Sequence, residues 1–159
     1  MSQNGDARRV LRDPILFLAF GLGSGLVPRM PGTAGSLAGL LLFLPMFALP
    51  FGGRLLLVAA LCLVGIVLCG VAARRLNTHD HPGIVWDEFC GMWLTLLVVP
   101  ADVFWILGAF GLFRLFDIWK PWPIRYLDKN VPGGLGIMLD DIIAALYAAT
   151  ILLVAMFLI

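Results

Sequence analysis

The chain has 159 residues, of which 61% are hydrophobic and 13% are charged, and its formal net charge is +1. Soluble domains are about half apolar and about a quarter charged, so this composition predicts an integral membrane protein. The small net charge excludes the broad basic surface that nucleic-acid binding requires, and we expect no nucleic-acid partner. The length suits one domain over residues 1–159, with a polar N-terminal tail at residues 1–13.

The apolar pattern predicts an all-α bundle of short and broken helices. Asp13-Pro14 is a typical helix start, Pro45 predicts a kink, and Pro100 separates two apolar stretches. A spanning helix needs about 20 apolar residues, so several of the helices are too short to cross a bilayer alone. The predicted helices cover residues 15–22, 33–49, 55–73, 89–99, 103–116 and 137–159.

Positive charge is expected on one side of this bundle. Of the 11 lysines and arginines, all but Arg54 lie in the N-terminal segment, the first glycine-rich loop, or in and beside the polar segments 77–88 and 117–136. Because cytoplasmic loops of membrane proteins are enriched in lysine and arginine, we expect these segments to face the cytoplasm. The stretch 89–116 must then enter and return as a hairpin that turns at Pro100.

Most acidic residues gather in the same polar segments and at the helix ends beside them. An ionised carboxylate next to an apolar helix is costly unless it is paired. Asp87 and Glu88 open one predicted helix, and Asp140 and Asp141 are expected in the first turn of another. The acids of this group are Asp80, Asp87, Glu88, Asp117, Asp128, Asp140 and Asp141.

Two interpretations of the paired acids are open. Carboxylates stabilise a helix N-terminus, so each pair could be a helix cap. Capping explains less well two adjacent pairs that share one predicted face with Asp80 and Asp117, because like charges repel. A hard divalent cation relieves that repulsion, and carboxylates, water and phosphate oxygens are the ligands of magnesium. We therefore predict Mg²⁺ as a cofactor, with ligands from Asp87, Glu88, Asp140 and Asp141.

Arg114, Asp117 and Lys120 are spaced at i, i+3 and i+6, which places them on one stripe of a helix. The stripe is either an ordinary ladder of ion pairs or a phosphate site in which Arg114 and Lys120 bind the anion. In the second case Asp117 positions the cations or joins the metal site. Pro121 ends the helix, and Arg125 beyond it adds charge for phosphate, solvent or lipid headgroups.

The glycine-rich loop GLGSGLVPRMPGTAGS lacks the preceding strand and the GK[ST] sequence of nucleotide-binding loops. Its glycines suit either a tight turn inside the bundle or an anion site. In the anion site, backbone N–H groups of Gly32 and Thr33 would face a phosphate at a helix N-terminus. Both interpretations stay open.

The cysteines match no metal or disulfide spacing. Cys69 and Arg75 fit the C-x5-R pattern of cysteine phosphatases, but they fall in or beside a predicted spanning helix. The N–H groups of a helix are already used and cannot wrap around a phosphate. We therefore predict that Cys69 has no catalytic part.

Three long runs of sequence resemble the phosphatidylglycerophosphatase A family: GLGSGLVPRMPGTAGSL, HDHPGIVWDEFCGMW and FRLFDIWKPWPIRYLDKNVPGGLGIMLDDIIAALYA. The resemblance covers nearly the whole chain. It implies an all-α fold and Mg²⁺-dependent hydrolysis of phosphatidylglycerophosphate to phosphatidylglycerol and phosphate, at the bacterial inner membrane.

The resemblance and the residue arguments together define an expected site at the cytoplasmic face of a multi-pass protein. We expect attack by water that the metal activates rather than a covalent enzyme–phosphate, with Asp80 or Asp117 transferring the proton. The expected catalytic residues are Asp80, Asp87, Glu88, Asp117 and Lys120, and the expected phosphate ligands are Gly32, Thr33, Arg114, Lys120 and Arg125.

A different class of function is a small membrane transporter or channel with an acidic ion site. It would explain broken helices and intramembrane charge. It predicts polar residues at mid-membrane, whereas the sequence predicts them at helix ends.

Overall fold

The computed structural model describes residues 3–78 and 81–159, and every regular element within those ranges is a helix. The all-α prediction is thereby confirmed. The elements in chain order are α1 (Gln3–Arg12), α2 (Pro14–Ala19), η1 (Gly21–Leu26), α3 (Pro31–Phe43), η2 (Leu44–Ala48), α4 (Phe51–Leu76), α5 (Trp86–Leu96), α6 (Val103–Trp119), α7 (Ile124–Asn130) and α8 (Gly133–Leu158).

Local sequence accounts for several helix boundaries. Asp13 caps α2, because its Oδ1 accepts a hydrogen bond from the backbone N of Ile15 at 3.0 Å. Asp102 caps α6 in the same way, through the backbone N of Phe104 at 3.0 Å. The α-helix α3 gives way to the 3-10 helix η2 around Pro45, where the sequence predicted a kink.

Other boundaries differ from the sequence prediction. Helix α3 begins at Pro31, because proline is already shaped for the first helical position, so Thr33 and Ser36 lie inside the helix. Helix α8 begins at Gly133 rather than near residue 137. The N-terminal tail also contains α1, and the polar segment 117–136 contains α7; an apolar pattern could not indicate either helix because both are largely polar.

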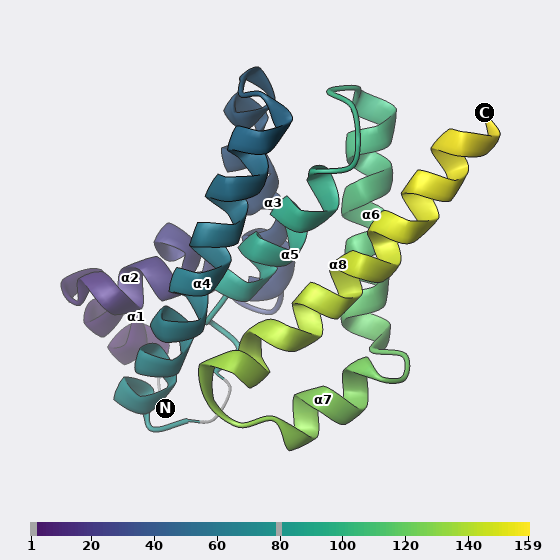
Figure 1. Ribbon diagram of the computed structural model, residues 1–159. Helices are drawn as coiled ribbons and strands as arrows, with labels where there is room; N and C mark the ends of the chain where they lie inside the picture. The colour runs from purple at the N-terminus through teal and green to yellow at the C-terminus, as the bar shows by residue number, and fades with distance from the viewer. Residues whose placement is uncertain (1–2, 79–80) are drawn as a thin grey trace.

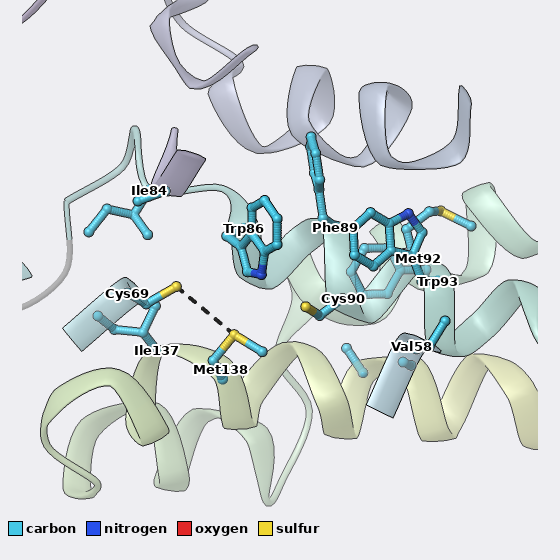
Figure 2. Close-up of a cluster of buried hydrophobic side chains, with 14 of the residues drawn as sticks. Val58, Cys69, Ile84, Trp86, Phe89, Cys90, Met92, Trp93, Ile137 and Met138 are labelled. Atoms are coloured by element: carbon cyan, nitrogen blue, oxygen red, sulfur yellow. Dashed lines mark hydrogen bonds between the residues drawn. The ribbon is translucent and has the colours of Figure 1, made fainter. Parts of the chain in front are cut away.

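The long helix α8 organises the bundle. It packs against α4, α5, α6 and α7, and Figure 1 shows it crossing the molecule diagonally in green to yellow. Helix α5 lies between α3 and α8. Its aromatic residues Trp86, Phe89 and Trp93 lie at ring-centroid distances of 5.5–5.9 Å from one another. Figure 2 shows them beside Cys69 and Met138, whose sulfur atoms are 4.0 Å apart.

Helices α4 and α8 cross so closely that only glycine fits at the contact. A Cβ on Gly134 would lie 1.8 Å from the carbonyl oxygen of Ile66 and 2.7 Å from the backbone N of Gly70. Small residues allow apolar helices to meet backbone to backbone. This crossing sets the position of the residues that follow in α8.

The two ends of the bundle differ. The C-terminal end of α4 and helix α7 lie at one end, whereas the α3–α4 connection, the α5–α6 connection and the C-terminus lie at the other (Figure 1). Helices α5 and α6 pack together and run in opposite directions, which is the hairpin that the charge distribution required.

Within the described residues, three helical stretches are long and apolar enough to cross a membrane: Pro31–Ala48, Phe51–Leu76 and Gly133–Leu158. Their outer faces carry exposed hydrophobic side chains such as Val67, which is 66% exposed, and Phe157, which is 90% exposed. Apolar surfaces of this extent are stable in lipid rather than in water. The chain is therefore a membrane protein.

Candidate active site

Three helices bring five carboxylates together. Asp87 and Glu88 lie in the first turn of α5, Asp117 lies near the end of α6, and Asp140 and Asp141 lie in α8. Two groups have carboxylate oxygens within 4.8 Å of one another: Asp87 with Glu88 and Asp141, and Asp117 with Asp140 and Asp141. Because Asp141 belongs to both groups, the five form one continuous set, which we call the acid cluster.

Helix capping does not explain the α8 half of the acid cluster. The sequence prediction that Asp140 and Asp141 lie in the first turn was wrong: α8 begins at Gly133, which places both in its third turn. The stabilising effect of a helix dipole falls off within the first turn. Asp140 and Asp141 are nevertheless only 7% and 2% exposed, a costly position for carboxylates without a compensating positive charge.

Two carboxylate oxygens of the acid cluster lack a hydrogen-bond partner among the described residues. Burial, reinforced by the neighbouring Asp141 and Asp117, raises the pKa of Glu88 to about 8. In the part of the chain that the structure describes, Glu88 Oε2 and Asp140 Oδ1 are buried without a hydrogen-bond partner. Buried carboxylate oxygens without a partner fit a bound cation, and an all-oxygen ligand set suits a hard divalent ion such as Mg²⁺.

Arg114 lies beside the acid cluster, next to α3. Its guanidinium forms an ion pair with Asp117 and donates long hydrogen bonds to Ser36 Oγ at 3.3 Å and Thr33 Oγ1 at 3.4 Å. Those distances exceed the usual range for a strong hydrogen bond, so the guanidinium retains donor capacity for an anion. The predicted pairing of Arg114 with Asp117 is confirmed.

The N-terminus of α3 meets the same group. Gly32 and Thr33 occupy the first turn of α3, where backbone N–H groups have no partner within the helix. A Cβ on Gly32 would lie 2.4 Å from Glu88 Oε1 and 3.3 Å from Arg114 Nη1. Glycine at this position therefore allows the N-terminus of α3 to lie close to both side chains, so an anion bound at this helix N-terminus would lie beside Arg114.

Lys120 closes the cluster on the side of α7. It ends α6 in a left-handed conformation, with φ of 46°. Its Nζ lies 2.7 Å from Asp140 Oδ2 and 3.2 Å from Asp128 Oδ1. Although burial favours the neutral amine, these two carboxylates raise the pKa of Lys120 above its ordinary value. The ammonium group is therefore a fixed positive charge at the edge of the acid cluster.

Most of the predicted site residues converge here. Asp80, and His79 beside it, lie outside the described residues. Arg125 is exposed and lines a separate pocket that it shares with Lys120. The structure brings together Gly32, Thr33, Asp87, Glu88, Arg114, Asp117, Lys120, Asp140 and Asp141.

Sequence reasoning missed the roles of Ser36 and Asp128. Ser36 is fully buried, donates to the carbonyl oxygen of Gly32 at 2.9 Å and accepts from Arg114. Its spacing of three residues from Thr33 would have placed both on one helix face, had the helix start at Pro31 been recognised. Asp128 had no local signal, because its contact with Lys120 depends on how α7 folds back.

The cysteine pattern does not form a site. Cys69 lies within helix α4, as predicted, and Arg75 also lies within it because α4 extends to Leu76. Cys69 is buried against Met138, and Arg75 forms an ion pair with Asp13. The helical backbone between them has no free N–H groups with which to bind phosphate.

The chain is similar in sequence to known proteins over most of its length. The chain is 47% identical over 147 residues to the Phosphatidylglycerophosphatase A of Escherichia coli (strain K12), an alignment that covers 92% of this chain and 86% of that protein. It is 46% identical over 154 residues to the Phosphatidylglycerophosphatase A of Haemophilus influenzae, covering 95% of this chain and 94% of that protein.

A third relative carries a different name. A protein of Bacteroides thetaiotaomicron, provisionally named phosphatidylinositol-3-phosphatase, is 39% identical over 150 residues, covering 89% of this chain and 92% of that protein. No solved structure matches the chain. The sequence profile described as Phosphatidylglycerophosphatase A matches residues 17–156. With most of its length matched by that profile and by two curated relatives, the chain belongs to the phosphatidylglycerophosphatase A family.

Proposed function

We propose that this membrane phosphatase hydrolyses phosphatidylglycerophosphate to phosphatidylglycerol and phosphate in a Mg²⁺-dependent reaction. The observation that carries the proposal is the convergence of Arg114, Lys120 and the N-terminus of α3 on the acid cluster. This combination supplies charge complementary to a phosphomonoester on one side and to a divalent cation on the other. The names of the two nearly full-length relatives support this choice of substrate.

The metal would be held by carboxylates of α5 and α8, namely Asp87, Glu88, Asp140 and Asp141. When bound, Mg²⁺ neutralises charge on phosphate oxygens and lowers the pKa of water. The rest of the chemistry falls to the protein. Thr33 and the N–H groups of the first turn of α3 orient the phosphate, and Arg114 donates to the oxygens that gain charge in the transition state.

Asp117 is our candidate for proton transfer. It accepts the proton of the attacking water and returns it to the glycerol oxygen as the phosphorus–oxygen bond breaks. Its ion pair with Arg114 holds the carboxylate beside that guanidinium. Lys120 adds positive charge, and Asp128 and Asp140 hold its ammonium group in place.

Phosphate release from purified protein in mixed micelles tests the proposal. Phosphatidylglycerophosphate with Mg²⁺ should give rapid release, a chelator should abolish it, and added Mg²⁺ should restore it. Phosphatidylinositol 3-phosphate is the informative comparison, because one relative carries the corresponding name. Faster phosphate release from phosphatidylinositol 3-phosphate would show that this lipid is the better substrate. Release that survives the chelator would contradict the metal site. The transporter alternative predicts no phosphate release from either lipid.

We further propose that the site faces the cytoplasm of a bacterial inner membrane, because the lysines and arginines concentrate at its end of the bundle. The test uses chains whose native cysteines are replaced by alanine. An impermeant thiol reagent outside intact inner membranes should label Gly52→Cys, at the opposite end, and should spare Asn130→Cys. Both positions are exposed. Labelling of Asn130→Cys alone would show that the protein has the opposite orientation in the membrane.

A further inference from the structure

An open pocket of about 520 Å³ lies at the corner between α6 and α7, beside the acid cluster. Its lining includes Trp119, Lys120, Trp122, Arg125 and Tyr126. Lys120 belongs both to this pocket and to the acid cluster, where its Nζ contacts Asp140. A molecule whose phosphate occupies the cluster could therefore extend past Lys120 into the pocket. We call this hollow the corner pocket.

The charge of the corner pocket suits a second anion. Lys120 and Arg125 line it, and no acidic residue is found in its lining among the described residues. The charge of Lys120 is already offset by Asp128 and Asp140. Arg125, by contrast, forms no ion pair within residues 3–78 and 81–159. An exposed guanidinium with free donors binds a phosphate through paired hydrogen bonds.

The aromatic lining suits the surface of a bilayer. Trp119 is 63% exposed, Trp122 is 81% exposed and Tyr126 is 61% exposed. In membrane proteins, tryptophan and tyrosine are enriched at the level of the lipid headgroups. The pocket is also held in place, because Tyr147 Oη in α8 donates a hydrogen bond to the carbonyl oxygen of Trp122 at 3.1 Å.

We propose that the corner pocket binds the phosphodiester of the lipid substrate through Arg125, while the terminal phosphomonoester lies at the acid cluster. The inference rests on the proposed function, because phosphatidylglycerophosphate carries both groups, separated by one glycerol. Arg125 is then a specificity residue. It favours lipids whose monoester stands beyond a diester over phosphatidic acid, whose monoester is attached directly to diacylglycerol. In this proposal Arg125 binds a different phosphate from the one that Arg114 binds.

The test compares two substrates on one preparation. For Arg125→Ala, the ratio of kcat/KM for phosphatidylglycerophosphate to kcat/KM for phosphatidic acid should fall by ~10–100-fold, the usual effect of losing a charge-assisted contact. The loss should lie mainly in KM, because the diester does not change during the reaction. Arg125→Lys should recover part of the ratio. Because both rates come from one preparation, loss of folded enzyme cancels.

A soluble inhibitor provides a second measurement that needs no turnover of phosphatidic acid. Glycerophosphoglycerol carries the diester without acyl chains, and its inhibition constant should rise by ~10–100-fold in Arg125→Ala. The inhibition constant of inorganic phosphate should change much less. The matched control is Arg12→Ala, an exposed arginine of α1 outside the pocket, which should leave the substrate ratio and both inhibition constants as in the unchanged chain.

The possible failures are distinguishable. If Arg125→Ala lowers kcat/KM for both substrates by the same factor, Arg125 only binds bulk lipid headgroups and the inference is wrong. It is equally wrong if neither the ratio nor the glycerophosphoglycerol constant changes. If the unchanged protein releases no phosphate from phosphatidylglycerophosphate, the proposed function fails first.

Discussion

Helices α4 and α8 are alike in length and in apolar character but differ in where they carry charge. Both have 26 residues, and their most apolar windows have mean hydropathies of 3.0 and 2.3. They cross where Gly70 meets Gly134. Helix α4 carries charged side chains only near its ends, including Arg74 and Arg75 in its last turn. Helix α8 instead buries Asp140 and Asp141 within its length.

The difference shows what allows an apolar helix to carry charge. Helix α4 turns much of its surface outward, and any ionised group there would face lipid. The acidic turn of α8 lies against α5 and α6, where Lys120 contacts Asp140 and where further carboxylates make a cation site possible. The composition of α4 thus reflects the membrane alone, whereas that of α8 also reflects a chemical site.

Removing charge from the acidic turn of α8 should have the largest effect on activity. Asp141→Asn keeps size and shape but removes the carboxylate shared by both halves of the acid cluster. If the cluster holds a metal, kcat/KM for phosphate release should fall by ~10²–10⁴. Asp87→Asn, Glu88→Gln and Asp117→Asn should show losses in the same range.

The matched control for these variants is Asp102→Asn, at the opposite end of the bundle. Asparagine caps helices as well as aspartate does, so α6 should keep its start and the enzyme its rate. High Mg²⁺ should partly rescue a variant that has lost only metal affinity, but should not rescue the loss of a proton-transfer group. Near-normal rates in all four cluster variants would refute the metal site.

The next largest effect is a dependence of Mg²⁺ affinity on pH. The pKa of Glu88 is raised to about 8, so in the absence of metal this group is protonated at neutral pH. Metal binding needs the ionised form and must release the proton. Apparent affinity should therefore fall as pH falls, by about tenfold per unit below 8, and level off above 8. Calorimetric Mg²⁺ titrations in buffers of different ionisation enthalpy measure the released proton.

Glu88→Gln is the variant that isolates this effect. Its residual Mg²⁺ affinity should be weaker but should vary less between pH 6 and 8. An unchanged slope would show that another group supplies the proton.

The contact between α4 and α8 can be weakened without touching a charge. Gly134→Ala forces a methyl group against the backbone of Ile66 and Gly70, so the helices must separate, at a cost of ~1–3 kcal/mol in the free energy of unfolding. Gly111→Ala in α6 is the control, because a Cβ there meets nothing within 4 Å. Thermal unfolding in detergent should show a lower Tm for the first variant only. Equal Tm values would mean that the crossing is not tight.

The smallest effect is expected inside α4. Cys69→Ala removes a sulfur atom that contacts Met138, and the helical backbone around it cannot bind phosphate. Phosphate release should stay nearly intact in protein that is folded and inserted into the membrane. A complete loss of activity would instead favour a covalent cysteine mechanism and would remove the contrast between the two helices.

Much of the fold could be predicted because its signals are local. The cap of α2 and the kink depend on Asp13 and Pro45 and their immediate neighbours, and apolar length indicates which helices are long enough to cross a membrane. The prediction failed where no apolar pattern exists, at α1 and α7. It also failed at the start of α8, where Gly133 and Gly134 look like a loop but begin the helix, and Gly134 contacts α4.

The sequence by itself determined an apolar all-α membrane protein, its family, and the concentration of acids and bases at one end, because composition and motif order need no spatial information. Tertiary structure decided which oxygens face one another. It placed Asp141 in both halves of the acid cluster and Arg125 in the lining of the corner pocket. It also brought Ser36 into contact with Arg114, and Asp128 into contact with Lys120. Those outcomes depend on the rotation and crossing of helices distant in sequence, which residue spacing within one helix does not specify.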